Sequence, residues 1–249
     1  MTGEENLMKK RFEELSERSY FNGIYTFTEF LSPAEQALLR SSVQKVPYRF
    51  FGGFDGAEKT IAVFGSEELC GYVFEPPISF VKIEPASQKF SDELSHRDFL
   101  GSIMSLGIKR STFGDLIVKD NCGYTVCLEN IADYICDNLL SIKHTSVRCS
   151  VLSEFPKEII PAPVESEFVV ASERLDSVVS AIYKLSRSES KNLVEHEKVL
   201  VGGIPVLGTD YRPRENDIIT VRGHGKFIYV GLERETKKGR LRCKAKIYR

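Results

Sequence analysis

The stretch that decides the fold of the C-terminal region is RLDSVVSAIYKLSRSE, residues 174–189. Between Leu175 and Ile182 its apolar side chains recur at spacings of three, four and seven residues, and this period predicts an amphipathic helix. Ser186 and Glu189 follow with the Ser-x-x-Glu pattern of a capping box, which begins a second short helix. We therefore expect two short helices here, the second ending near His196.

The start of the second helix has features that suit a phosphate group. Its first backbone amides lack partners within the helix and carry a partial positive charge. Arg187 and Lys191, four residues apart, share one face near that end. A helix end of this kind is a ready anion site. The alternative interpretation is a capped surface helix with two incidental cations.

The last predicted strand gives the clearest physical signal in the chain. Residues 240–247 alternate basic and apolar side chains, so a period of two places every cation on one face. Residues 222–249 hold 10 basic and 2 acidic side chains. The basic side chains of this strand and of the turn before it are Lys237, Lys238, Arg240, Arg242, Lys244 and Lys246. We interpret this segregation as a surface for a phosphate backbone.

Charge is distributed unevenly along the 249 residues, although the net charge is only −1. Residues 172–249 hold 17 Lys and Arg against 10 Asp and Glu, whereas residues 1–171 hold 17 against 25. This asymmetry favours a polyanion as the partner of the C-terminal region. A solvated basic surface is the other possible interpretation of the charge alone.

Composition bounds the remaining classes of protein. No run of 18 apolar residues predicts a membrane span, and the acidic start does not resemble a secretory signal, so we expect a cytoplasmic protein. The six cysteines form no C-x-x-C pair and the four histidines fall at no zinc spacing. We expect reduced structural thiols, no metal site and no cofactor.

The order of elements predicts an α+β protein with three domains. Residues 1–75 read as a small α/β domain, in which Ser32 caps a helix and 48–51 and 60–64 form strands. Residues 76–160 read as the ferredoxin-like, RRM-like order β-α-β-β-α-β, with a second helix over 129–143. Proline-rich residues 161–171 read as an extended linker, and 172–249 form the last domain. An aromatic-rich third strand is missing from the middle domain, where only Tyr124 is available for stacking.

Four segments of the C-terminal region resemble the S4 domain, the small RNA-binding module of ribosomal protein S4. They are residues 174–176, 186–188, KVLVGG at 198–203 and DIITVRG at 217–223. The resemblance implies an αL-type S4 domain, here followed by a basic β-hairpin tail. Upstream, HRDFLGS at 96–102, LGIKR at 106–110 and GGFDGAE at 52–58 resemble the YlmH family, so the resemblance covers nearly the whole chain.

Resemblance to the YlmH family implies binding to ribosomal RNA and tRNA on the large (50S) ribosomal subunit. The implied role is in ribosome-associated quality control, on subunits that carry a stalled peptidyl-tRNA. The RNA contacts implied residue by residue are Arg174, Ser186, Arg187, Ser188, Lys191, Lys198, Arg222 and Lys226. A second candidate RNA surface in the middle domain comprises Arg97, Lys109 and Arg110.

We expect a monomer without catalytic residues. Two other classes of function stay open at this point. One is an S4-tethered RNA-modifying enzyme similar to pseudouridine synthases, although too few residues follow Asp176 to form a synthase domain. The other is a cell-division adaptor.

Overall fold

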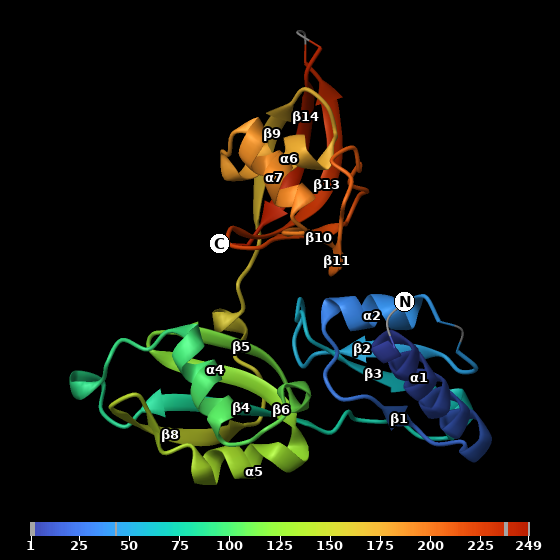
Figure 1. Ribbon diagram of the computed structural model, residues 1–249. Helices are drawn as coiled ribbons and strands as arrows, with labels where there is room; N and C mark the ends of the chain where they lie inside the picture. The colour runs from blue at the N-terminus through green and yellow to red at the C-terminus, as the bar shows by residue number, and fades with distance from the viewer. Residues whose placement is uncertain (1–2, 43, 237–238, 249) are drawn as a thin grey trace. The chain divides into compact units, whose positions relative to one another are not determined.

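The computed structural model describes residues 3–42, 44–236 and 239–248 and divides into two compact units, residues 1–160 and 161–249 (Figure 1). It confirms the α+β class. Among the described residues, no helix combines the length and the apolar character that a membrane crossing requires.

The N-terminal part of the first unit is a small sheet with helices on one face. Its elements are α1 (Gly3–Asn22), β1 (Thr26–Phe27), α2 (Pro33–Arg40), β2 (Tyr48–Phe51), β3 (Ile61–Phe64) and α3 (Glu67–Cys70). The strands pair in the order β1-β3-β2, and all pairs are antiparallel. Ser32 caps α2 through the predicted capping box with Glu35. On the helix face, Phe64 of β3 packs with Phe12 of α1 and Leu39 of α2.

The middle part of the first unit has the predicted ferredoxin-like order. Its elements are β4 (Ile78–Pro85), η1 (Gln88–Phe90), α4 (His96–Ser105), η2 (Arg110–Thr112), β5 (Phe113–Lys119), β6 (Cys122–Leu128), α5 (Glu129–Asn138), β7 (Ser141–Ile142), β8 (Thr145–Leu152) and η3 (Lys157–Ile159). The antiparallel sheet runs β5-β6-β4-β8-β7, which places the first and third long strands at its centre. Phe99 and Ile103 of α4 and Ile135 of α5 are fully buried against one face of this sheet.

The second helix of this part is shorter than the sequence predicts. The apolar period suggests a helix to residue 143, but α5 ends at Asn138 and Ile142 enters β7. Lys143 has a positive φ of 52°, so the chain turns there into the β7–β8 hairpin. Ile142 remains in the core, which explains why an apolar residue at this position continues the helical spacing of the sequence.

A third buried cluster joins the N-terminal and middle parts. Ile61 and Val63 of β3 lie in one buried cluster with Val126 of β6 and with Phe155 and Ile159, which follow β8. Polar contacts reinforce this packing, since the Phe30 amide donates to the Ser111 carbonyl at 2.8 Å. The two parts therefore form one unit, although each also has a buried cluster of its own.

The second unit is a six-stranded sheet with two helices on one face. Its elements are β9 (Val164–Val170), α6 (Leu175–Tyr183), α7 (Arg187–Glu195), β10 (Val199–Val201), β11 (Ile204–Pro205), β12 (Ile218–Val221), β13 (Gly225–Glu235) and β14 (Leu241–Ile247). The strand order is β11-β10-β12-β13-β14-β9. Val178, Val179 and Val194 of the helices share a buried cluster with Phe227 and Tyr229 of β13.

Most of the predicted linker at 161–171 is strand β9. It pairs with β14 over its whole length, from Val164 opposite Ile247 to Val170 opposite Leu241. Prolines 156, 161 and 163 suggest an irregular segment, yet the residues after them alternate sides as a strand does. Phe168 and Val170 pack against the core, and Glu165 and Glu167 are exposed.

Gly123 tests the packing of the middle domain. A methyl group at Gly123 would meet the ring of buried Phe99 at 2.6 Å, whereas a methyl group at Gly101 of α4 would meet no atom within 4 Å. We expect Gly123→Ala to lower the free energy of unfolding by about 1–3 kcal/mol through overpacking. Gly101→Ala should raise it by about 0.5–1 kcal/mol through helix propensity. Denaturant unfolding of both variants checks this, and equal effects would contradict the close packing of Gly123 against Phe99.

Candidate nucleic-acid interface

Helix α7 begins with the capping box that the sequence predicts. The Glu189 amide donates to the Ser186 hydroxyl at 3.2 Å, and the Ser186 amide donates to Oε2 of Glu189 at 2.8 Å. Hydrogen bonds from the Ser186 side chain and from its backbone amide lower the pKa of the Glu189 carboxyl. The Ser188 hydroxyl lies 3.0 Å from that of Ser186, so both hydroxyls gather at the helix start. The box thereby fixes the place of the side chains that follow it.

A hollow of about 290 Å³ lies where the starts of α6 and α7 meet. The side chains that line it are Ala171, Ser172, Arg174, Asp176, Ser177, Arg187 and Ser190. Hydroxyl and guanidinium groups donate hydrogen bonds, and guanidinium groups match phosphate oxygens in pairs. The hollow therefore brings together donors that suit a phosphate.

The two arginines of this hollow differ in what they already bind. Arg174 donates from Nε to Oδ1 of Asp176 at 3.1 Å and from Nη2 to Oδ2 at 3.0 Å. Its Nη2 also donates to the Thr209 hydroxyl at 3.2 Å, which anchors the side chain further. Arg187 is exposed and makes no ion pair within the described part of the chain. Arg187 is thus the more available of the two for an external anion.

The remaining predicted contacts of the S4 region lie on its surface. Lys191 pairs with Glu195 at 3.4 Å on the exposed side of α7, and such a pair is worth only about 0.3–0.5 kcal/mol. Arg222 and Lys198 are neighbours at the ends of β12 and β10, where the Arg222 amide donates to the Lys198 carbonyl at 2.8 Å. Both side chains are exposed.

Aromatic rings also occur in this unit, one of them beside the predicted contact Lys226, and the sequence reasoning missed them. The rings of Tyr183 and His224 have centroids 5.5 Å apart. Nζ of Lys226 lies 4.3 Å from the centroid of Tyr248. The Tyr183 hydroxyl is buried without a hydrogen-bond partner among the described atoms, and burial raises its pKa to about 12. Interleaved rings and cations are what unstacked bases require. The only sequence signal is His224 between two glycines.

Strand β14 has the two faces that its alternation predicts. Cys243 and Ala245 are fully buried under the helices. Arg242, Lys244 and Lys246 point to the other face. The amphipathic strand is therefore confirmed as structure.

Carboxylates on both neighbouring strands accompany these cations. Nη1 of Arg242 lies 2.9 Å from Oε2 of Glu167 on β9. Nζ of Lys244 lies 3.7 Å from Oε1 of Glu165 and 3.8 Å from Oε1 of Glu167. It also lies 3.2 Å from Oε1 of Glu233 on β13. The hydrogen bond to Glu233 raises the pKa of Lys244. Arg242 and Lys244 are therefore neutralised within the sheet, because residues expected in a linker pair beside them.

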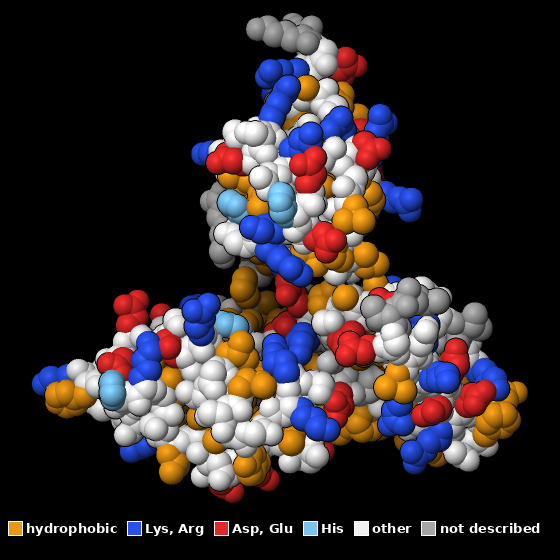
Figure 2. All heavy atoms as spheres, viewed as in Figure 1, with side chains coloured by type: hydrophobic (Ala, Val, Ile, Leu, Met, Phe, Trp, Pro, Cys, Tyr) orange, Lys and Arg blue, Asp and Glu red, His pale blue; other side chains and the backbone are white. Residues whose placement is uncertain are grey.

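The other tail cations fall into two groups. Arg240 and Lys246 are exposed and make no ion pair among the described residues. Lys237 and Lys238 lie outside the described residues. On the face of the C-terminal unit seen in Figure 2, acidic side chains also lie among the basic ones. The RNA contacts of the tail stay a prediction.

The second candidate surface in the middle domain is only partly available. Arg97 and Lys109 are exposed. Arg110 donates from Nη1 to the carbonyls of Phe113 at 2.8 Å and Gly114 at 3.2 Å, and its guanidinium carbon lies 4.3 Å from the centroid of the Phe113 ring. Burial lowers the pKa of this guanidinium. Arg110 thus braces the start of β5 from within.

The chain itself covers much of the sheet face that an RRM would use. Phe80 of β4 and Val126 of β6 occupy the central positions of that face. The Phe155 ring packs edge-on against Phe80 with centroids 5.8 Å apart, and it stacks on Phe54 at 4.4 Å. Tyr124 packs at the border of this cluster. Stacking of bases on the central strands is therefore blocked in this structure.

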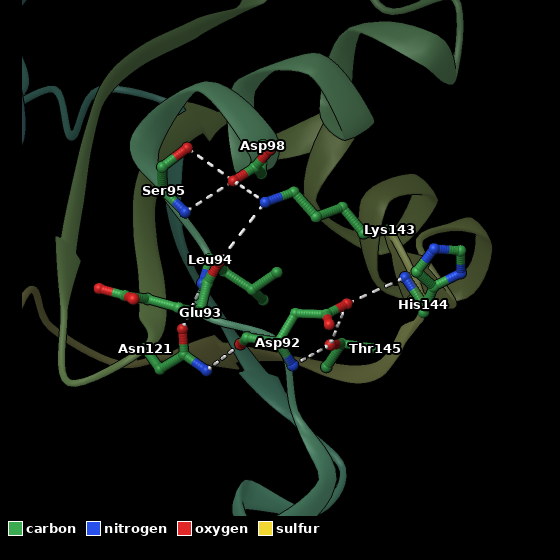
Figure 3. A network of polar contacts seen from close by, with 9 residues as sticks. All are labelled: Asp92, Glu93, Leu94, Ser95, Asp98, Asn121, Lys143, His144 and Thr145. Carbon is green, nitrogen blue, oxygen red and sulfur yellow. Dashed lines mark hydrogen bonds and ion pairs between the residues drawn. The ribbon is translucent and has the colours of Figure 1, made fainter.

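A polar network fixes the start of α4 (Figure 3). Oδ2 of Asp98 accepts from the Ser95 amide at 2.8 Å and the Ser95 hydroxyl at 2.6 Å, and Nζ of Lys143 lies 2.7 Å away. These contacts, led by Lys143, lower the pKa of Asp98 to about 2. The helix start is thus braced by Ser95, Asp98 and Lys143, while His96 and Arg97 point outward as exposed side chains.

Family models match two segments of the chain. The family model described as the putative RNA-binding domain in YlmH matches residues 74–154, and the S4 domain model matches residues 173–219. The chain is 28% identical over 221 residues to the ribosome-associated protein quality control protein P2 of Bacillus subtilis (strain 168), covering 86% of this chain and 84% of that protein. The solved structure of the cell division protein YlmH from Streptococcus pneumoniae superimposes with a TM-score of 0.50 at 19% identity, covering 61% of this chain and 93% of that one. The last likeness bears on the fold alone.

Fold, basic helix end and matching domains define an RNA-binding protein of the S4-domain class. The resemblance to the YlmH family that the sequence predicts is confirmed by both domain matches and by the Bacillus relative. Within the described residues, His, Cys, Asp and Glu side chains form no cluster that could hold a metal ion.

Asp98 provides a test of the network at α4. Its pKa of about 2 lies below the ordinary 3.8, so its contribution to stability is complete above pH 4 and is lost as the pH falls towards 2. We expect Asp98→Asn to destabilise the protein at pH 7 and the difference from the wild type to shrink between pH 4 and pH 2. Denaturant unfolding across this pH range measures it. A difference that stays constant with pH would contradict the ion pair with Lys143.

The carboxylates of β9 provide a test of the basic tail. If Arg242 and Lys244 contact phosphates, Glu165→Gln with Glu167→Gln removes their internal competitors. Affinity for ribosomal RNA should rise, and the slope of log affinity against log salt should steepen by up to about two. Filter binding over a salt series measures both. Glu4→Gln with Glu13→Gln on α1 is the control with the same change in net charge, and equal effects of the two pairs would show that β14 does not face RNA.

Proposed function

We propose that this protein binds ribosomal RNA and tRNA on the large (50S) ribosomal subunit and acts in ribosome-associated quality control. Its partner would be the subunit that carries a stalled peptidyl-tRNA. The name of the Bacillus relative and the two RNA-binding domain matches support this role. The protein would act by binding, as a cytoplasmic monomer without catalytic residues or a cofactor.

The observation that carries the proposal is the surface at the start of α7. The capping box presents Arg187 beside a hollow whose lining also includes Ser172, Ser177 and Ser190. Such a site receives one phosphate of a backbone and holds it by charge and hydrogen bonds. The neighbouring rings of Tyr183 and His224 add faces on which an unpaired base can stack.

The anchored Arg174 and the available Arg187 have different roles in this proposal. Arg174 is held by Asp176 and Thr209, so it sets the shape and potential of the hollow. Arg187 has no such anchor within the described part of the chain and closes on the phosphate. Lys191, Lys198 and Arg222 then extend the positive surface along the RNA backbone.

Arg187→Ala tests this function. We expect weaker co-sedimentation with purified 50S subunits and a salt slope lower by about one, because one phosphate contact is lost. Arg18→Ala on α1 is the matched control, since it removes an exposed cation from the other unit. Pelleting over a salt series measures both variants.

The proposal fails if the wild type does not pellet with 50S subunits at low salt. It also fails if Arg187→Ala and Arg18→Ala bind alike. Detection of modified nucleosides after incubation of the purified protein with ribosomal RNA would instead favour the RNA-modifying enzyme.

A further inference from the structure

The middle domain presents its aromatic side chains in an unexpected place. Its central sheet face is covered by Phe155 and Phe54, so bases cannot stack there. Yet the turn between β4 and α4 displays Phe90, whose side chain is 80% exposed. This is the most exposed large apolar side chain in the described part of the chain. Figure 1 shows this turn projecting from the sheet and helices.

Phe90 is not displayed by a slack loop. The Asn121 side chain accepts from the Leu94 amide at 2.7 Å and donates to the Asp92 carbonyl at 2.8 Å and the Ser91 hydroxyl at 3.0 Å. The Asp92 amide donates to the Thr145 hydroxyl at 2.8 Å. Figure 3 shows that Asp92, Asn121 and Thr145 come from three separate segments of the domain. The base of the turn is therefore fixed, and the exposed ring costs little entropy to order on binding.

The charges around the Phe90 ring favour stacking on a base over long-range electrostatic attraction of RNA. Nζ of Lys89 lies 5.5 Å from the centroid of the Phe90 ring. The carboxylates of Asp92 and Asp98 already accept hydrogen bonds from within the domain. Glu93 and Asp120 are also exposed, and their two carboxylates outweigh the single charge of Lys89. A contact at this turn must therefore draw most of its strength from the ring.

We propose that Lys89 and Phe90 form a second RNA contact, in which the Phe90 ring stacks on an unpaired base and Lys89 meets the phosphate of that nucleotide. This inference rests on the proposed function, because both require RNA. An aromatic face accepts any base, and a cation beside it satisfies the adjoining phosphate. The middle domain thus binds RNA through a braced turn, while its sheet face serves to hold the N-terminal part.

The absence of tryptophan from the chain allows a direct test. In Phe90→Trp all indole fluorescence comes from position 90. We expect saturable quenching of this fluorescence when the full-length variant is titrated with protein-free ribosomal RNA, because a stacked base quenches an indole. Phe21→Trp is the matched control, since Phe21 is 70% exposed and has Nζ of Lys45 at 5.0 Å from its ring centroid. Its fluorescence should not change.

Affinity gives a second readout. Phe90→Ala should weaken RNA binding by about tenfold, the effect of losing one stacked base, and leave the melting temperature unchanged. Lys89→Gln should lower the salt slope by about one.

Three results would overturn the inference. If Phe90→Trp binds RNA without a change in fluorescence, position 90 does not stack on a base, whereas the proposed function still holds. If the fluorescence of Phe90→Trp changes with intact 50S subunits but not with free RNA, the side chain at position 90 contacts a ribosomal protein and not a base. Failure of the wild type to bind either particle or RNA overturns the proposed function as well.

Discussion

The pairing of β14 between β13 and β9 is the constraint on which the C-terminal unit depends. It places Cys243 and Ala245 beneath α6 and α7, and so closes the core that orients the two helices. A shift of one residue would turn Arg242 and Lys244 into that core and expose its apolar side chains. The same register places Lys244 opposite Glu167 and Lys246 opposite Glu165. Core, helix orientation and surface charge therefore follow from a single strand pairing.

Local patterns predicted most elements but not what lies beside them. The capping boxes at Ser32 and Ser186 were visible because a few adjacent residues determine a helix start. The prolines before β9 predict a linker instead of a strand, and the partner strand of β9 lies far along the chain. For the same reason sequence could identify the cations of β14 but not their carboxylate neighbours. Nor could it bring Tyr183 to His224, which are brought together only when the helices pack on the sheet.

The middle domain shows how one topology can use its surfaces differently. In the RRM arrangement the face away from the helices is open, but here Phe155 and Ile159 pack over it and β3 continues the cover. The cover is apolar and buried, so removing it would expose a core. The domain lacks an open sheet face, but it has an exposed turn that hydrogen bonds of Asn121 and Asp92 hold in place. Function on such a fold has to be argued from its exposed residues rather than from its topology.

The ion pairs across β9, β14 and β13 have a consequence for selectivity. Glu165, Glu167 and Glu233 are tethered to the sheet, so an anion that pairs with Arg242 or Lys244 must displace carboxylates that stay close to it and repel it. A small anion such as free phosphate gains too little from Arg242 or Lys244 to displace a tethered carboxylate. Only a ligand whose charges are closely spaced and held along a rigid path can exchange with several of them together. The sheet thus selects ligands by their charge density, because a ligand with sparse charges cannot displace the carboxylates from Arg242 and Lys244.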